Sequence, residues 1–129
     1  MTPKLLTAIP QLFTCDLTAS LAFFEKLGFK PAFTYGEPPF YAQVVRDGVA
    51  LNLRHVDTPV TDKARAAAED LLAVSITLDT DAAAETLFNE FSGAGIQFHQ
   101  QLARQPWGAL DFIAVDPNGN LLHFAGPAH

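Results

Sequence analysis

Cysteine, basic residues and long apolar runs are all scarce in this sequence of 129 residues. The single cysteine, Cys15, excludes an intrachain disulfide and a cysteine zinc cluster. Because Cys15 stands in a mostly apolar stretch, we expect it to be a buried, inert thiol. No apolar run approaches the roughly 20 residues of a membrane-spanning helix, and the first residues lack the basic start and apolar core of a signal peptide. We therefore expect a soluble protein of the cytoplasm.

The charge balance excludes further classes of partner. Eight Lys and Arg stand against 14 Asp and Glu, which gives a net charge of −6, and the basic residues are scattered along the chain. There is no basic patch for a phosphate backbone or an anionic membrane, so neither nucleic acid nor a membrane is an expected partner. The negative surplus favours cationic ligands, although a charge of this size is also common in proteins that merely stay soluble.

Two similar halves are visible in the pattern of apolar residues and turns. Short strands are expected at residues 5–15, 29–35, 40–46 and 49–56 of the first half, and at 71–78, 96–101, 110–115 and 121–125 of the second. An amphipathic helix follows the first strand of each half. The first helix begins at Asp16 or Thr18 and stops at Gly28, and the second begins within residues 79–81 and stops at residues 93–95. Each half thus has the order β-α-β-β-β.

The repeated order suggests an internal duplication in which Asp16 matches Asp79 and Gly48 matches Gly119. The sequence predicts one α+β domain, 1–129, made of modules at about 5–56 and 71–126. The connector 57–70 between them carries a helical turn at 63–70. One helix cannot cover both faces of a module's sheet. Pairing of the modules, within or between chains, should therefore close curved sheets around a cavity.

Three segments carry a resemblance to a known family. They are the strand and helix of residues 8–29 ending in Leu-Gly-Phe, the turn Gln-Pro-Trp-Gly at 105–108, and residues 116–124 with their Asp-Pro-Asn-Gly-Asn turn. With these segments the chain resembles the glyoxalase/bleomycin resistance/dioxygenase superfamily, also called vicinal oxygen chelate proteins, and within it the bleomycin resistance branch most closely. The resemblance implies two βαβββ modules whose partly open sheets surround a cleft. It also implies a homodimer in which the N-terminal arm around Pro10 crosses to the partner.

Enzymes of this superfamily hold a divalent metal at four positions that correspond here to Ile9, Asn52, Ala73 and His123. The two aliphatic side chains cannot coordinate a metal, and a single imidazole does not hold an ion that takes three or four protein ligands. We therefore expect no metal and no other cofactor. Asn52 and His123 each follow a turn glycine by four residues, so we interpret them as equivalent polar contacts for a ligand. An acid–base pair of His123 with Asp111 or Glu37 remains open.

Aromatic residues offer the other part of a binding surface. Phe33, Tyr35, Phe40 and Tyr41 flank the loop at residues 36–39, and Trp107 stands in the Pro-Trp-Gly turn. In the resistance branch, an aromatic residue of the loop before the third strand and the tryptophan of that turn sandwich the planar rings of the drug at the dimer interface. The resemblance assigns these roles to Phe40 or Tyr41 and to Trp107. For Phe33 and Phe40, ordinary core positions remain an alternative.

Two features depart from the resistance branch. Val74 and Ile76 stand where its best-known members carry bulky aromatics, and Arg54 stands where a small polar residue is usual. A smaller stacking surface and an added positive charge both work against a cationic glycopeptide such as bleomycin.

The sequence therefore predicts a metal-free, dimeric protein that sequesters an amphipathic or aromatic small molecule, such as a bleomycin-type antibiotic. The candidate ligand contacts are Phe33, Phe40, Tyr41, Asn52, Arg54, Trp107, Asp111 and His123, and no catalytic residue is assigned. The alternatives are a metal-dependent lyase, isomerase or dioxygenase of the same superfamily with atypical ligands, and a protein that only mediates protein association.

Overall fold

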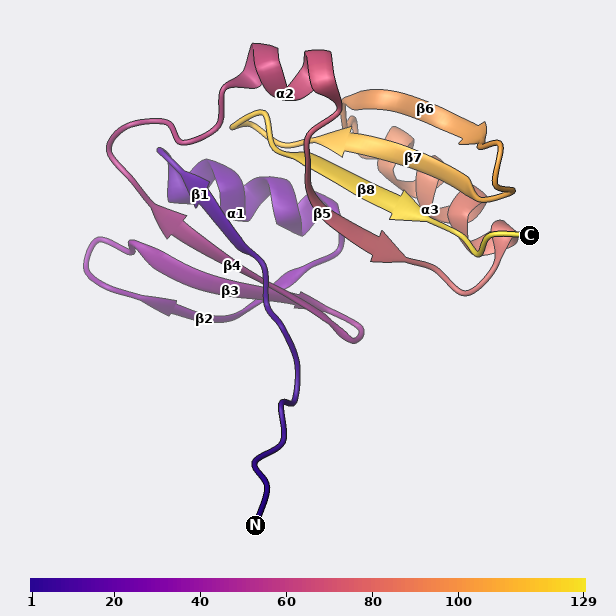
Figure 1. The fold of residues 1–129 in the computed structure, drawn as a ribbon. Coiled ribbons are helices and arrows are strands. Elements are labelled where there is room, and N and C mark those ends of the chain that lie inside the picture. Colours follow the sequence, from indigo (N-terminus) through magenta and orange to yellow (C-terminus); the bar gives the residue numbers. More distant parts are fainter.

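The computed structural model describes all 129 residues and consists of two four-stranded sheets with three helices (Figure 1). The first module contains β1 (Gln11–Thr14), α1 (Leu17–Lys26), β2 (Lys30–Tyr35), β3 (Tyr41–Arg46) and β4 (Val49–His55). After α2 (Lys63–Glu69), the second contains β5 (Leu72–Thr77), α3 (Asp81–Gly93), β6 (Phe98–Arg104), β7 (Leu110–Val115) and β8 (Leu121–Ala125). The α+β fold of two βαβββ modules predicted from the sequence is confirmed.

The two sheets have the same topology. Their strand orders are β1-β4-β3-β2 and β5-β8-β7-β6. In each sheet the first strand of the module pairs in parallel with its last strand, and all other neighbours are antiparallel. Asn52 and His123 therefore take equivalent places, on the strand next to the parallel edge of each sheet.

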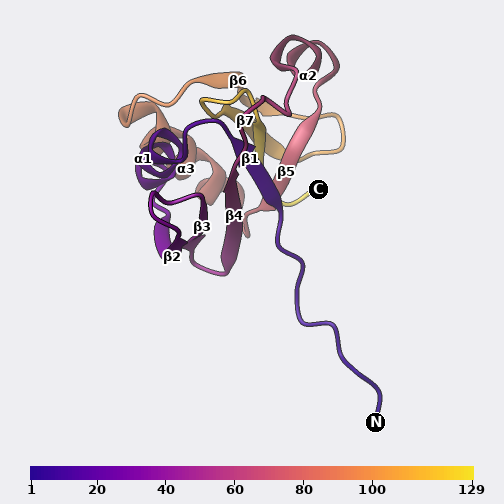
Figure 2. The ribbon, with the colours of Figure 1, turned by 90° about the vertical axis from the view of Figure 1, so that its left-hand side faces the viewer.

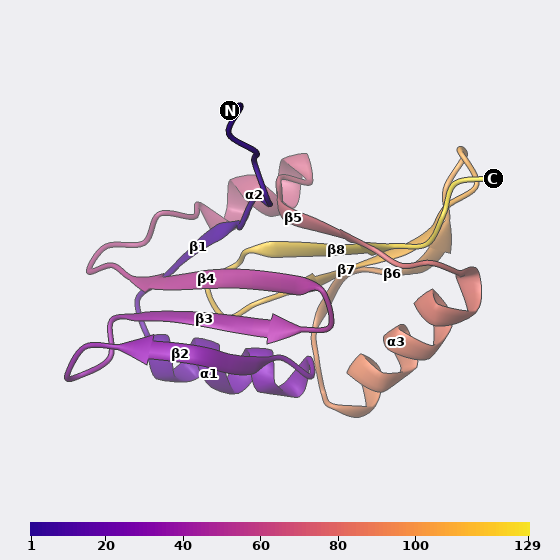
Figure 3. The ribbon, with the colours of Figure 1, turned by 90° about the horizontal axis from the view of Figure 1, so that it is seen from below.

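A single apolar core joins the two modules. Helix α1 packs on β2, β3 and β4, and α3 packs on β7 (Figure 3). One face of each sheet meets these helices in a continuous cluster that contains Leu12, Phe24 and Leu53 from the first module and Phe91 and Phe112 from the second. None of the helices combines the length and the apolar composition that a bilayer crossing requires.

The N-terminal caps of α1 and α3 show that the predicted alignment of the two modules is off by one residue. The Asp16 carboxylate accepts a hydrogen bond from the backbone N–H of Ala19 and caps α1, as predicted. In α3 the cap is the hydroxyl of Thr80, which accepts from the N–H of Ala83, and not the carboxylate of Asp79. Thr80, one residue further on, is thus the structural counterpart of Asp16.

The predicted stop of α1 at Gly28 has two physical reasons. Gly28 has φ +83°, and a Cβ atom there would lie 2.6 Å from Nη1 of Arg46. The Arg46 guanidinium cannot move away freely, because it donates to the carbonyl of Leu27 at 2.6 Å and to the Glu90 carboxylate at 2.7 Å. These bonds tie the end of α1 in the first module to α3 in the second.

Replacing Gly28 with alanine is accordingly expected to lower the free energy of unfolding by about 1–3 kcal/mol, through a strained backbone and a displaced Arg46. Urea denaturation followed by circular dichroism measures the loss. Gly93 is the matched control, because it lies at the end of a helix where an added Cβ would meet no other atom within 4 Å, so alanine there should be neutral or stabilising. Equal stability changes for the two variants would contradict the role of Gly28.

Three sequence predictions are wrong in detail. The first strand spans only Gln11–Thr14, and residues 1–10 have no regular structure. The start of this segment leads away from the body (Figures 1 and 2), whereas the carbonyl of Pro10 still accepts from the N–H of Asn52. The sixth strand begins at Phe98, because Ile96 is buried and its N–H closes the end of α3 on the carbonyl of Phe91. Cys15 is exposed and not buried, since the neighbouring Thr14 takes the inward position at the end of β1.

Candidate functional site

Each sheet has a second face that no helix covers. In the first sheet, Leu12, Ala42, Val44, Leu51 and Leu53 point into the core, so the residues between them point to the opposite side. Strand pairing aligns these residues in two rows, Gln11–Asn52–Gln43–Phe33 and Phe13–Arg54–Tyr41–Tyr35. We call this surface the N-terminal open face.

Polar groups in the first row are linked to one another. Nε2 of Gln43 donates to Oδ1 of Asn52 at 3.0 Å, and Asn52 is buried at 8% exposure. Arg54, in the second row, is exposed and forms no ion pair. Asp47, at the turn between β3 and β4, lies 3.9 Å from Arg46 and not beside Arg54. Arg54 thus leaves a free guanidinium on the N-terminal open face.

Three of the four aromatic residues at the end of this face are exposed, and the fourth, Tyr41, is half-buried. Phe33 is 43% and Phe40 48% exposed, so the alternative that they are core residues is wrong. Phe33 contacts Tyr41 with ring centroids 5.9 Å apart, and Tyr35 contacts Phe40 edge-on at 5.6 Å. We call these four residues, which flank the β2–β3 loop, the aromatic strip. They form two ring pairs whose remaining surface is open to solvent.

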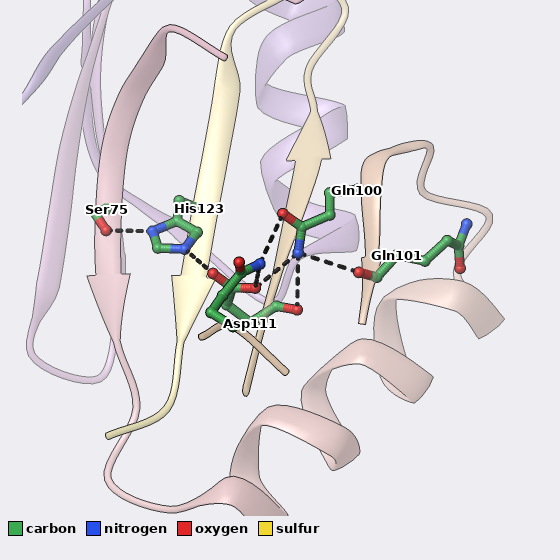
Figure 4. A network of polar contacts seen from close by, with 6 residues as sticks. Ser75, Gln100, Gln101, Asp111 and His123 are labelled. Carbon is green, nitrogen blue, oxygen red and sulfur yellow. Dashed lines mark hydrogen bonds and ion pairs between the residues drawn. The ribbon is translucent and has the colours of Figure 1, made fainter. Parts of the chain in front are cut away.

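The open face of the second sheet carries a chain of hydrogen bonds (Figure 4). Oγ of Ser75 on β5 lies 2.6 Å from Nδ1 of His123 on β8, and Nε2 of His123 lies 2.8 Å from Oδ2 of Asp111 on β7. The other carboxylate oxygen, Oδ1, accepts from Nε2 of Gln100 at 2.7 Å and from Nε2 of Gln105 at 2.9 Å. We call these five residues the serine–histidine–aspartate network.

The hydrogen bonds of the network favour the ionised form of Asp111 and select one tautomer of neutral His123. Burial is the largest influence on Asp111 and raises its pKa, but the hydrogen bonds from His123, Gln105 and Gln100 together outweigh it and leave the pKa below its ordinary value. An ionised carboxylate only accepts hydrogen bonds, so the His123 nitrogen that faces it, Nε2, carries the proton. In the neutral imidazole, Nδ1 is then the acceptor for the hydroxyl proton of Ser75.

Trp107 lies beside this network along the chain and is 59% exposed. The backbone N–H of Gly108 donates to the carbonyl of Gln105, which closes a turn with Trp107 near its tip. The side chain of Gln105, two residues before Trp107, holds Asp111. The turn therefore supplies one hydrogen bond to the network and presents a large, flat side chain to solvent.

The structure also corrects which residues of β5 face outward. Ile76 is 8% exposed and belongs to the core, and Val74 packs against it, so neither lies on the open face. Ser75, between them, takes that position, so the comparison of Val74 and Ile76 with stacking aromatics in related proteins concerned the wrong face. Sequence analysis missed Ser75, Gln100 and Gln105, although parallel pairing of a first strand with a last strand would have placed Ser75 beside His123.

The metal positions of the superfamily do not suit a metal in this chain. Ile9 and Ala73 have no donor atom, and both ring nitrogens of His123 are engaged, one with Asp111 and one with Ser75. No group of three or more His, Cys, Asp or Glu side chains is arranged to hold an ion. These residues do not fit a divalent metal ion.

A cleft of about 740 Å³ lies away from both open faces. It is bounded by the β3–β4 turn, the end of β5 and α3, and none of the eight candidate ligand contacts lines it. A smaller groove of about 340 Å³ is lined by residues 7–10, 48–51 and 74–77, which include Ser75.

Comparison with known proteins agrees with this architecture. The family model of the glyoxalase/bleomycin resistance protein/dioxygenase superfamily matches residues 6–124. The fold is similar to that of a bleomycin resistance determinant encoded on the transposon Tn5, with 24% identity, a TM-score of 0.71, and 95% of this chain and 98% of the other covered. A bleomycin-binding protein from Streptomyces verticillus, complexed with copper(II)-bleomycin, gives 24% identity, a TM-score of 0.70, and coverage of 98% and 99%.

A glyoxalase/bleomycin resistance protein/dioxygenase from Nocardioides is 20% identical, with a TM-score of 0.70 and coverage of 100% and 87%. No functionally curated protein matches the sequence. These structural likenesses establish the fold, and the family match spans nearly the whole chain. The chain belongs to the glyoxalase/bleomycin resistance protein/dioxygenase superfamily.

Proposed function

We propose that this protein binds and sequesters an amphipathic or aromatic small molecule without a metal, and that a bleomycin-type antibiotic is the first ligand to test. The observation that carries the proposal is the placement of large aromatic side chains outside the core. The aromatic strip and Trp107 expose flat apolar surface next to polar groups that could fix the orientation of a ligand. Two structures of similar fold hold bleomycin or its copper complex, which supports this choice of ligand.

The chemistry of the two surfaces suits such a ligand. A planar heteroaromatic group stacked on an aromatic side chain gains about 0.5–1.5 kcal/mol beyond the burial of its surface. The N-terminal open face adds the amides of Gln43 and Asn52, and the second sheet adds His123 and Asp111. Sequestration needs affinity alone, and micromolar binding corresponds to about 8 kcal/mol, within reach of two stacked rings with several hydrogen bonds.

Intrinsic fluorescence of Trp107, the only tryptophan, tests the proposal. We expect saturable quenching by metal-free bleomycin or its copper complex at micromolar concentration. Two salt concentrations should be compared, because the net charge of −6 attracts a cationic ligand more strongly at low salt. By calorimetry, Trp107→Ala should weaken binding at least about ten-fold, or 1.4 kcal/mol.

Leu72→Ala is the matched control, since Leu72 is an exposed apolar residue, at 43%, on a different strand. This variant should bind as the parent protein does. If neither form of bleomycin produced quenching or binding heat, bleomycin would be excluded as the ligand. Equal affinity of the Trp107→Ala variant would contradict the assigned role of the tryptophan.

The proposal includes a homodimer, in which the aromatic strip of one subunit and Trp107 of the other flank one ligand. It also places the protein in the cytoplasm, where the free thiol of the exposed Cys15 stays reduced. Support for the dimer comes from the N-terminal arm, residues 1–10. Leu5 and Leu6 are 102% and 92% exposed, so this arm presents apolar side chains that nothing in its own subunit covers (Figure 2).

Deletion of residues 1–9 is accordingly expected to abolish the dimer and leave monomer or aggregate, which sedimentation velocity measures. A milder variant, Leu5→Ser with Leu6→Ser, keeps the length of the arm and should weaken the dimer in the same direction. An unchanged dimer in both variants would show that the arm does not cross to the partner.

A further inference from the structure

The serine–histidine–aspartate network contains the three groups of a base-activated nucleophile in the required order. The Asp111 carboxylate holds the Nε2–H of His123 at 2.8 Å, and the free lone pair of Nδ1 points at the Ser75 hydroxyl at 2.6 Å. Both distances are within the range of a hydrogen bond between a nucleophile and its base. The two ring nitrogens exchange their usual roles compared with serine hydrolases, in which Nε2 faces the serine, but the direction of proton transfer is the same.

The environment of each member fits its role. Asp111 is only 3% exposed, and two glutamine amides hold its second oxygen, so the carboxylate cannot turn away from the imidazole. The His123 side chain is 16% exposed and held at both nitrogens. Ser75, in contrast, is exposed, and Figure 4 shows it at the outer end of the network. A reagent can therefore reach the hydroxyl while the base behind it stays shielded.

The groove of about 340 Å³ beside Ser75 indicates the class of molecule that could reach it. Its volume is that of a small ligand site. Seven of its 12 lining residues are hydrophobic, among them Ile9 and Pro10 of the arm and Leu51 of β4. No basic side chain lines the groove, so an uncharged, short apolar acyl group fits it better than a phosphate or a carboxylate.

We propose that Ser75 is a nucleophile activated by His123, and that it accepts acyl groups from uncharged carboxylic esters that carry a short apolar acyl chain. Ser75 and His123 are the catalytic residues, and Asp111 is a positioning residue that acts through His123. Nothing in this activity requires the proposed ligand sequestration, because the ester occupies the groove at β5 and not the aromatic strip.

Ser75, His123 and water account for every proton and bond in the reaction. Oγ of Ser75 attacks the ester carbonyl, its proton passes to Nδ1 of His123, and the bond from the carbonyl carbon to the leaving oxygen breaks with its electron pair. The leaving alkoxide takes the proton from Nδ1; a good leaving group departs as an anion instead, and Nδ1 then returns its proton to the solvent before the next step. Water then attacks the acyl-serine, gives a proton to Nδ1, and releases the acid as Oγ takes that proton back. No redox partner or cofactor enters the balance.

The test uses the full-length protein and p-nitrophenyl butyrate, with release of p-nitrophenolate and mass spectrometry of the acylated protein as readouts. We expect a burst of up to one p-nitrophenolate per chain and one butyryl group on the peptide that contains Ser75. Ser75→Ala should abolish both signals. Ser92→Ala, at an exposed serine of α3 outside the network, should leave them unchanged.

The Asp111→Asn variant distinguishes a role of Asp111 in positioning His123 from a purely structural role. It should lower the acylation rate at saturating ester by about 10²–10⁴-fold while the ester concentration for half-saturation stays the same and the circular dichroism spectrum remains native. Ser75→Cys, which retains a nucleophile at the same place, should restore labelling. A burst that survives in Ser75→Ala, or a butyryl group on another residue, would overturn the proposal. So would the absence of any adduct in a protein that still shows the Trp107 quenching described above, and this outcome leaves the sequestration proposal intact.

Discussion

Replacing Phe112 with alanine is expected to lower the free energy of unfolding by about 3–5 kcal/mol, a large part of the roughly 5–15 kcal/mol that a domain possesses. Phe112 on β7 is fully buried and stacks on Phe124 with ring centroids 5.2 Å apart and planes inclined by 14°. Its ring also makes T-shaped edge contacts with Phe88, Phe91 and Phe98. Alanine would leave a cavity that this many rigid rings cannot fill by small shifts.

Urea denaturation, followed by both circular dichroism and Trp107 fluorescence, measures the loss. Phe40→Ala is the matched control, because Phe40 is 48% exposed and has one aromatic neighbour, so its loss should stay below about 1 kcal/mol. Because one core joins the two modules, both probes should report a single transition. Separate transitions for the two probes, or equal losses for the two variants, would contradict the single core.

The elements were largely predictable, because their signals are local. Asp16 and Gly28 mark the ends of α1 through capping and positive φ, and the strands β7 and β8 begin and end at the residues predicted from their apolar pattern. The errors occur where a contact between residues distant in the sequence determines where an element begins or ends. Ile96 leaves the expected strand because it closes α3, and residues 5–10 have no neighbouring strand along most of their length.

The site was predictable only in part, because its residues meet through strand register. His123, Asp111 and Trp107 were singled out as candidates, but the partners that define their chemistry lie far away in the sequence. Ser75 precedes His123 by 48 residues, and it faces outward only because β5 is aligned as it is beside β8. A shift of one residue in that pairing would place Val74 or Ile76 at the open face, which is the arrangement that the sequence alone suggested.

The second large effect is expected at Asp111, where replacement by asparagine should lower the free energy of unfolding at neutral pH by about 2–4 kcal/mol. The carboxylate is buried and accepts three side-chain hydrogen bonds, from His123, Gln100 and Gln105. An asparagine amide offers one oxygen in place of two, and its NH₂ group would face either His123 Nε2–H or a glutamine donor. Facing a glutamine, the NH₂ group would leave that donor without an acceptor; facing Nε2, it would force the His123 proton onto Nδ1. In both cases the hydrogen bonds to a charged carboxylate are replaced by weaker neutral ones.

The same residue predicts how stability depends on pH. The pKa of Asp111 in the folded protein lies below its ordinary value of 3.8, so the folded state favours the ionised form. This stabilisation is fully present above pH 3.8 and is lost as the pH falls through the lowered folded-state pKa. The stability difference between the parent protein and Asp111→Asn should therefore shrink as the pH falls below 3.8.

The difference in unfolding free energy between the parent protein and Asp111→Asn does not contain the contributions of acidic groups that both proteins share. Asp116 titrates with the opposite sign, because burial raises its pKa above 3.8 against the hydrogen bonds from Asn120 and Asn118, and its contribution fades as the pH rises. Since Asp116 is present in both proteins, its contribution cancels. Asp70→Asn is the control for a histidine–aspartate pair in solvent, because Asp70 contacts His99 with its side chain 72% exposed, and its effect should stay within about 0.5 kcal/mol. If the stability difference between the parent protein and Asp111→Asn did not shrink below pH 3.8, the ionised carboxylate would not be the form that stabilises the network.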